Sequence, residues 1–299
     1  MITKGHIIKT LREKAGLRQE DFNSICSQTT LSRFEQGKQE ISWSVFNQLL
    51  HKLGEDPQNY LLAMTTNEKR ADALDREIVS YLNQANYEKA EALLDELETL
   101  KKSDDTIDAL AKFLRIVIAR CKGLSTEKAI QKLKEAFEWL GQPLTREDYR
   151  RKFFSKNELR ILNFLAICQV ECDERQAIEL FYLQKRYIEA SVADRLSFAN
   201  AYISATYNLS KLLGQSQAYE EALEVIADGL AWCDKYHRSE GLDGLVLNKA
   251  CILIKRDKTS TEGLRLLHLA YLSYQRKGNQ TTCEQILHFA STYEIEILL

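Results

Sequence analysis

A polar face made of hydroxyls, amides and one guanidinium runs along residues 27–33, opposite an apolar face. These are the side chains that read base edges in the major groove of DNA. A surface helix that needed only solubility would carry more Glu and Lys. We therefore interpret the stretch as the recognition helix of a DNA-binding unit. With two flanking residues, the candidate DNA contacts are Gln19, Ser27, Gln28, Thr29, Thr30, Ser32, Arg33 and Lys38.

Each of these residues also has a purely structural explanation. Arg33 could be a solvated surface residue, but arginine is the commonest direct reader of guanine, which favours a DNA contact. Gln19 could cap a helix, bind a phosphate, or do both. Glu35 is expected to be structural, because phosphates repel a carboxylate that has no partner.

A second set of polar residues recurs in phase in the later part of the chain. Asn163, Asn208 and Asn248 lie 14, 14 and 15 residues before a small residue of the following helix. An asparagine side chain matches both the C=O and the N–H of a peptide backbone. The alternative is that each asparagine serves its own helix or faces water. The candidate peptide contacts, with neighbours one turn away, are Arg160, Asn163, Ile167, Tyr202, Asn208, Lys211, Asn248, Cys251 and Ile252.

The composition predicts that helices position both the candidate DNA contacts and the candidate peptide contacts. The chain has 2 prolines and 12 glycines in 299 residues and is rich in helix formers, which indicates an all-α protein. Five short helices are expected in the N-terminal part. They span 3–15, begin near 18 and 27, span 42–53, and begin at Asp56-Pro57.

The remainder of the chain contains an internal repeat. Five segments begin a helix with a similar phrase: YEKAEALL, TEKAIQKL, ERQAIELF, YEEALEVI and TEGLRLLH. Their small residues, Ala90, Ala129, Ala177, Ala222 and Gly263, are spaced by 39, 48, 45 and 41 residues. An amphipathic helix precedes each, roughly at 70–84, 104–122, 156–172, 193–214 and 240–256. This pattern predicts a right-handed tetratricopeptide-like α-solenoid of about five helix pairs, with a capping helix at 279–297. We expect domains at 1–66 and 67–299.

Two resemblances to known families support this division. The pattern LRQEDF…LSRFEQGKQEISWSVFNQLLHKLG resembles the five-helix helix-turn-helix domain of phage-repressor (XRE-type) regulators, over residues 3–65. In that domain Gln19 would open the second helix. Arg12 stands where such domains often place an arginine that pairs with the glutamate corresponding to Glu35.

Over its full length the chain resembles the peptide-pheromone-responsive regulators of Gram-positive bacteria, the RNPP group, and within it the Rgg and PlcR types. The phrase YNLSKLLGQSQAYEEAL resembles the peptide-clamping repeat of the PlcR type, with Asn208 at the clamping position. The resemblance implies a transcription regulator in quorum sensing. Its repeat domain would form a homodimer and bind a short, secreted hydrophobic peptide after import.

Charge also favours a dimer. Residues 1–65 hold eight Lys and Arg against seven Asp and Glu, a net charge of only +1. Phosphate neutralisation by a single copy is therefore weak, and two copies on a palindromic operator would double the contacts.

The remaining sequence features argue against enzymes, metal-binding proteins and membrane proteins. The seven cysteines form no CxxC pair, and the sequence has no nucleotide loop, metal cluster or nucleophile–base motif, so we expect neither a catalytic site, nor a metal, nor a cofactor. No signal peptide or membrane-length apolar run is visible, which predicts a cytoplasmic protein. One alternative is a regulator of the same DNA-binding type whose repeats dock a protein partner. An enzyme-like repeat module is a second, less favoured, alternative.

Overall fold

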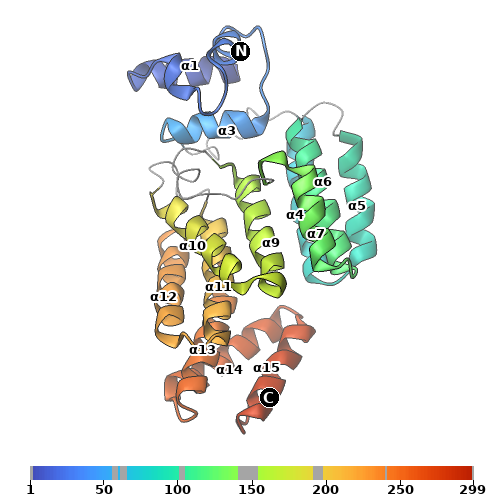
Figure 1. The fold of residues 1–299 in the computed structure, drawn as a ribbon, viewed down its shortest axis with the longest axis vertical. Coiled ribbons are helices and arrows are strands. Elements are labelled where there is room, and N and C mark those ends of the chain that lie inside the picture. The colour runs from blue at the N-terminus through green and yellow to red at the C-terminus, as the bar shows by residue number, and fades with distance from the viewer. Residues whose placement is uncertain are drawn as a thin grey trace. The chain divides into compact units, whose positions relative to one another are not determined.

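A computed structural model describes residues 3–55, 60, 66–100, 105–140, 154–190, 198–239 and 241–297. Among these residues every regular element is a helix, which confirms the all-α prediction (Figure 1). The chain divides into two compact units. Unit 1 comprises residues 1–177 and 186–197, and unit 2 comprises residues 178–185 and 198–299.

The helix-turn-helix region lies in unit 1. Its core is formed by seven buried apolar side chains, Ile8, Phe22, Leu31, Phe34, Phe46, Leu49 and Leu50. Hydroxyl side chains of Thr3, Ser27 and Ser42 cap the three α-helices by accepting a backbone N–H. The elements are α1 (Lys4–Lys14), the 3₁₀ helix η1 (Gln19–Phe22), α2 (Gln28–Glu35) and α3 (Trp43–Lys52).

The second helix is shorter than we expected. It is a single 3₁₀ turn, in which the Asp21 carboxylate accepts from the Arg18 backbone N–H at 2.6 Å. Asn23 and Ser24 follow, and such residues favour turns because their side chains compete for backbone hydrogen bonds. The predicted fifth helix, at Asp56-Pro57, lies outside the described residues.

The repeat helices follow the predicted positions closely. Unit 1 contains α4 (Thr66–Asn83), α5 (Tyr87–Leu100), α6 (Asp105–Cys121), α7 (Thr126–Ala136), the 3₁₀ helix η4 (Glu138–Leu140) and α9 (Lys156–Cys172). Helix α10 (Glu174–Ala190) contributes residues to both units. Unit 2 contains α11 (Ala199–Gln215), α12 (Tyr219–Lys235), α13 (Leu242–Arg256), α14 (Thr261–Arg276) and α15 (Gln280–Thr292). Helices pack as consecutive pairs, for example α11 on α12 and α13 on α14.

The small residue of each repeat has the packing role that the sequence predicted. Ala90, Ala129, Ala177 and Ala222 are all 0% exposed. At Gly263 a Cβ atom would lie 3.0 Å from Ile254 Cγ1 and 3.1 Å from the Leu253 Cβ, which is closer than most Cβ contacts, so the preceding helix would have to shift slightly to admit a side chain. Close approach of the two helices therefore favours a small residue here.

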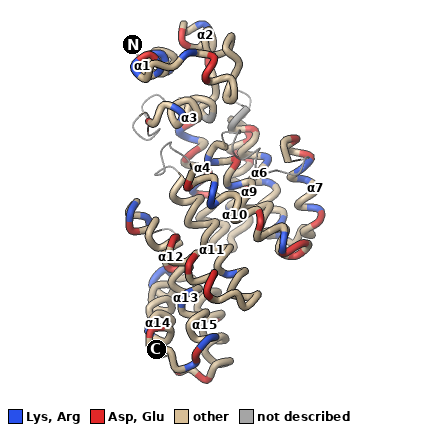
Figure 2. The backbone as a smooth tube through the Cα atoms, turned by 60° about the vertical axis from the view of Figure 1, so that its left-hand side comes forward, with Lys and Arg blue, Asp and Glu red and all other residues tan. Residues whose placement is uncertain are grey.

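Charges are mixed along the chain. Figure 2 shows acidic and basic residues interspersed over the helices, in keeping with the net charge of −2. No helix in the described part of the chain is both long enough and apolar enough to span a bilayer.

Candidate DNA-binding helix and ligand pocket

Helix α2 presents two different faces. Its apolar face is in the core, with Leu31 at 0% and Phe34 at 1% exposed. On the other face Gln28, Thr29 and Arg33 are exposed, and Lys38 is exposed in the turn after the helix. None of these four side chains forms a hydrogen bond or ion pair with any residue that the structure describes. They are therefore available to a partner outside the chain.

A buried carboxylate fixes how α2 sits on α1. Arg12 donates from Nε to Glu35 Oε1 at 2.7 Å and from Nη2 to Oε2 at 2.8 Å, which confirms the predicted pair. Gln19 Nε2 donates to the same Oε2 at 2.7 Å. The Gln19 amide nitrogen is thus committed to Glu35, so the side chain joins η1 to α2. Gln19 thus helps to position α2, and because its second N–H and its oxygen remain for other partners, its DNA contact stays a prediction.

Two predicted hydroxyl contacts also have structural roles. Ser27 is the N-cap of α2, where its Oγ accepts from the Thr30 N–H at 3.2 Å and lies 2.9 Å from Thr30 Oγ1. Ser32 Oγ accepts from Gln36 Nε2 at 3.1 Å. These bonds within the helix leave Gln28, Thr29, Arg33 and Lys38 as the strongest candidates for DNA contacts.

The predicted ligand residues on α9 differ in their surroundings. The Arg160 guanidinium binds the Asp75 carboxylate of α4 with two bonds of 2.7 and 2.9 Å, which joins α9 to α4. Because its charge is already paired, we assign Arg160 to the structure of unit 1 instead of to ligand binding. Asn163 is half-buried, and Ile167 is 41% exposed.

Tyr202 is not on the surface. Its side chain is 1% exposed and stacks on Trp232, with ring centroids 3.9 Å apart and an interplanar angle of 14°. The ring therefore packs α11 against α12 and cannot touch a ligand from this position. We predicted it to lie one turn from Asn208, but the two residues are six positions apart on α11, about one and two-thirds turns, and so they lie on different faces.

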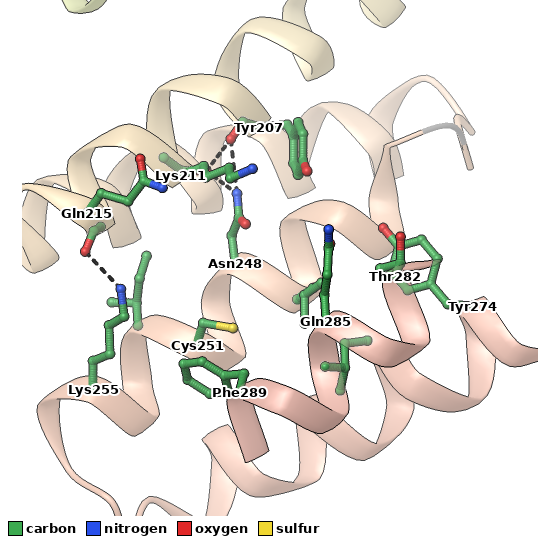
Figure 3. A pocket seen from close by; sticks show the side chains of 15 residues that line it. Tyr207, Lys211, Gln215, Asn248, Cys251, Lys255, Tyr274, Thr282, Gln285 and Phe289 are labelled. Carbon is green, nitrogen blue, oxygen red and sulfur yellow. Dashed lines mark hydrogen bonds between the residues drawn. The ribbon is translucent and has the colours of Figure 1, made fainter. Parts of the chain in front are cut away.

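Four of the predicted ligand residues do come together in unit 2, around a pocket of about 270 Å³. They are Lys211 on α11 and Asn248, Cys251 and Ile252 on α13. Figure 3 shows Gln215 and Lys255 toward one end of this pocket and Tyr274 and Thr282 toward the other. The remaining lining residues are Tyr207, Ser210, Gly214, Leu247, Gln285, Ile286 and Phe289.

The orientation of Asn248 is fixed by its neighbours. Its Nδ2 donates to the Tyr207 backbone oxygen at 2.9 Å and to Ser210 Oγ at 3.0 Å (Figure 3). A backbone carbonyl can only accept, so the amide nitrogen must face Tyr207. Both of its N–H groups are then used within the protein, and only the side-chain oxygen remains for a ligand. We predicted that Asn248 would offer a peptide backbone both a donor and an acceptor. In the structure it can offer only the acceptor.

Asn208 is oriented in a related way. Its Nδ2 donates to the Ser204 carbonyl, one turn back in α11, at 3.0 Å. One N–H thus serves the helix, and the second N–H and the oxygen are left for other partners. Asn208 is half-buried and is not among the residues that line the pocket.

Burial raises the pKa of Cys251 and of Tyr274, which both line this pocket. It raises the pKa of the Cys251 thiol to about 11, although the nearby Lys255 opposes the shift. Burial also raises the pKa of the Tyr274 hydroxyl to about 12, with smaller contributions from Tyr207 and Asp243. Both groups are therefore neutral near pH 7, and the charge at this pocket comes from its lysines.

The sequence predictions missed the side of the pocket built by α14 and α15. We treated α15 as a cap, yet Thr282, Gln285, Ile286 and Phe289 follow a helical spacing and face the cavity. The mixture of polar and apolar residues on one face of that helix was the available signal. Among the described residues there is no group of three or more His, Cys, Asp or Glu that could hold a metal ion.

Comparison with known families identifies both parts of the chain. Residues 5–59 match a model described as a helix-turn-helix domain, and residues 75–275 match the model of the RNPP family C-terminal domain. The chain belongs to the RNPP family. The predicted family is thus confirmed, and no curated protein matches by sequence.

Solved structures share the fold along almost the whole chain. PlcR of Bacillus thuringiensis, in complex with the peptide PapR7 and DNA, has 19% identity and a TM-score of 0.63, covering 96% of this chain and 99% of PlcR. ComR of Streptococcus vestibularis, with its signalling peptide XIP, has 16% identity and a TM-score of 0.58, covering 98% of each chain. ComR of S. thermophilus, with DNA and ComS, has 16% identity and a TM-score of 0.56, covering 98% of this chain and 100% of that one.

Proposed function

We propose that this RNPP-family protein is a sequence-specific transcription regulator controlled by a short signalling peptide, as in quorum sensing. The observation that carries the DNA-binding half is the outer face of α2. It presents Gln28, Thr29 and Arg33 to solvent without partners among the described residues, on a helix fixed by a buried ion pair. This is the geometry by which a helix-turn-helix reads base edges.

The regulatory half rests on the pocket of unit 2. It combines an apolar floor with an oriented asparagine oxygen and two lysines, presented by α11, α13 and α15. Such a site suits a peptide better than a folded protein surface, because it is concave and partly closed. The peptide contacts that we propose in unit 2 are Asn208, Lys211, Asn248, Cys251 and Ile252, and in unit 1 Asn163 and Ile167 remain candidates by themselves.

The proposal includes a homodimer that acts in the cytoplasm on a roughly palindromic operator and performs no catalysis. The net charge of +1 over residues 1–65 makes one copy a weak DNA binder. Two-fold symmetry then requires two half-sites about one helical turn apart, or a multiple of that spacing. Light scattering at micromolar concentration tests this directly. A monomeric mass both with and without DNA would contradict the dimer.

The DNA-binding half is tested with a randomised operator library. Replacing Arg33 with Ala should cost roughly 1–3 kcal/mol of specific binding and relax selectivity at one base position, because a bidentate base contact is lost. Arg18→Ala is the matched control, since the Arg18 side chain is 83% exposed and pairs with Glu20. Wild-type selectivity in the Arg33 variant would show that α2 does not read DNA through this residue.

A further inference from the structure

The charges around the pocket of unit 2 all have one sign. Of the described residues that line it, Lys211 and Lys255 are cationic and none carries a carboxylate. Neither lysine forms an ion pair with a described residue, whereas Lys249 on the same helix binds Glu262 at 2.6 Å. The only hydrogen bond of the Lys255 ammonium with a described residue is a long one, to the Gly214 carbonyl at 3.4 Å.

Both lysines line this pocket, Lys211 from α11 and Lys255 from α13. Lys255 reaches Gly214, and Lys211 lies three residues before Gly214 on α11, so about 4.5 Å along the helix axis. Lys211 is exposed, and its four-carbon stem can bring the ammonium to the Lys255 side. A carboxylate entering here would replace a weak carbonyl contact with charge-assisted hydrogen bonds.

Asn248 places a second requirement on the ligand. Because both N–H groups of Asn248 are used by Tyr207 and Ser210, the side chain offers only an acceptor to the pocket. A ligand that satisfies the whole site therefore carries a carboxylate for the lysines and an N–H donor for Asn248. Next to these groups, Leu247, Ile252 and Phe289 contribute apolar surface.

We infer that this pocket binds the carboxyl-terminal end of the regulatory peptide, with the free α-carboxylate at Lys211 and Lys255 and a backbone N–H donated to Asn248 Oδ1. The inference rests on the proposed function and adds to it the direction in which the peptide binds. A peptide carboxyl terminus carries an amide N–H and a carboxylate on adjacent groups. An aliphatic acid lacks the N–H donor.

The size of the cavity supports an end rather than a whole ligand. At about 270 Å³ the pocket is smaller than the roughly 300–1,000 Å³ typical of sites that enclose a drug-sized ligand. The terminal residue fits that space, with its apolar side chain on the floor. The preceding residues of the peptide then lie outside this pocket.

The test uses defined probes and the full-length chain. Four probes are titrated into the protein, and binding is followed by NMR of labelled methyl groups. The probes are N-acetyl-Leu-Leu with a free carboxylate, the same compound as its carboxamide, an ester analogue that lacks the last N–H, and octanoate. We expect the free acid to bind about 10- to 100-fold more tightly than the carboxamide, because a charge-assisted contact is lost. The ester analogue and octanoate should both bind more weakly than the free acid.

Variants assign the effect to the pocket. Replacing Lys211 and Lys255 together with Met should make the acid and the amide bind equally, whereas Lys249→Met removes the same kind of charge outside the pocket and should preserve the preference. Asn248→Leu should abolish the difference between amide and ester linkages while preserving the preference for the acid. Methyl resonances of Ile252 and Ile286 report whether the probe occupies this pocket.

Several results would overturn the inference. They are equal binding of acid and amide to the wild type, an acid preference that survives the double lysine replacement, octanoate binding as tightly as the peptide acid, or no binding of the acid up to about 10 mM. Failure here is distinct from failure of the proposed function. If a pool of short peptides still changes operator binding, only the assignment of the carboxyl terminus is lost.

Discussion

Removing the Arg12 guanidinium should destabilise the helix-turn-helix region more than any exposed charge replacement. In Arg12→Met the Glu35 carboxylate, whose side chain is 3% exposed, would keep Gln19 but lose both bonds from the guanidinium. The same replacement also removes the Arg12 Nη1 bond to the Leu17 carbonyl at 2.9 Å. Breaking a buried ion pair on one side costs about 3–5 kcal/mol.

Native-state hydrogen exchange of the α1 and α2 amides, followed by mass spectrometry, measures this local free energy. Arg18→Met is the control and should change it by less than about 0.5 kcal/mol, because its ion pair with Glu20 is exposed. Replacing Arg12 and Glu35 together with Met should recover most of the loss. A cost below about 1 kcal/mol at pH 7 would refute the role of this pair.

Three further predictions concern the repeats. Ala222→Leu should cost about 1–3 kcal/mol of unfolding free energy, because the site is 0% exposed. Ala227→Leu, on the exposed side of α12, should be nearly neutral. Equal urea midpoints for the two variants would contradict the packing role of Ala222. Burial raises the pKa of the Cys168 thiol from 9.0 to about 11 and that of the Tyr187 hydroxyl from 10.0 to about 12, so both favour the folded state only while protonated. Stability should accordingly fall as the pH rises from about 9 to about 11, and a melting temperature that stays constant over that range would exclude this. Asn208→Ala should weaken peptide binding by about 1–3 kcal/mol, as measured by calorimetry. Operator binding by the peptide-free protein, measured by gel shift, should not change. Unchanged peptide affinity would show that Asn208 does not contact the peptide.

Much of the fold could be predicted because it depends on local patterns. Helix boundaries followed from apolar periodicity and from caps such as Ser42, and the helix pairs followed from the recurring small residue. The pairing of Arg12 with Glu35 was also predictable, since it came with a recognisable motif.

The ligand site was less predictable because it depends on contacts between distant residues. Arg160 is paired with Asp75, a residue 85 positions away, and Tyr202 is covered by Trp232. The acceptor-only role of Asn248 depends on the Tyr207 carbonyl, which no side-chain pattern reveals. The spacing of the asparagines located α11 and α13, the helices that line the pocket. Which of their side chains remain available to a ligand depends on hydrogen-bonding partners elsewhere in the chain.

The most direct test of peptide-controlled DNA binding starts from the operator that the wild-type protein selects out of random duplex DNA. Affinity for that operator is then measured with and without a pool of short apolar peptides. The proposal predicts a two-fold symmetric operator and a change of at least about tenfold in affinity on adding the pool, and it predicts that the Asn248→Ala variant needs a higher peptide concentration for the same change. Selection of no sequence, or an operator affinity that the peptides leave unchanged, would contradict it.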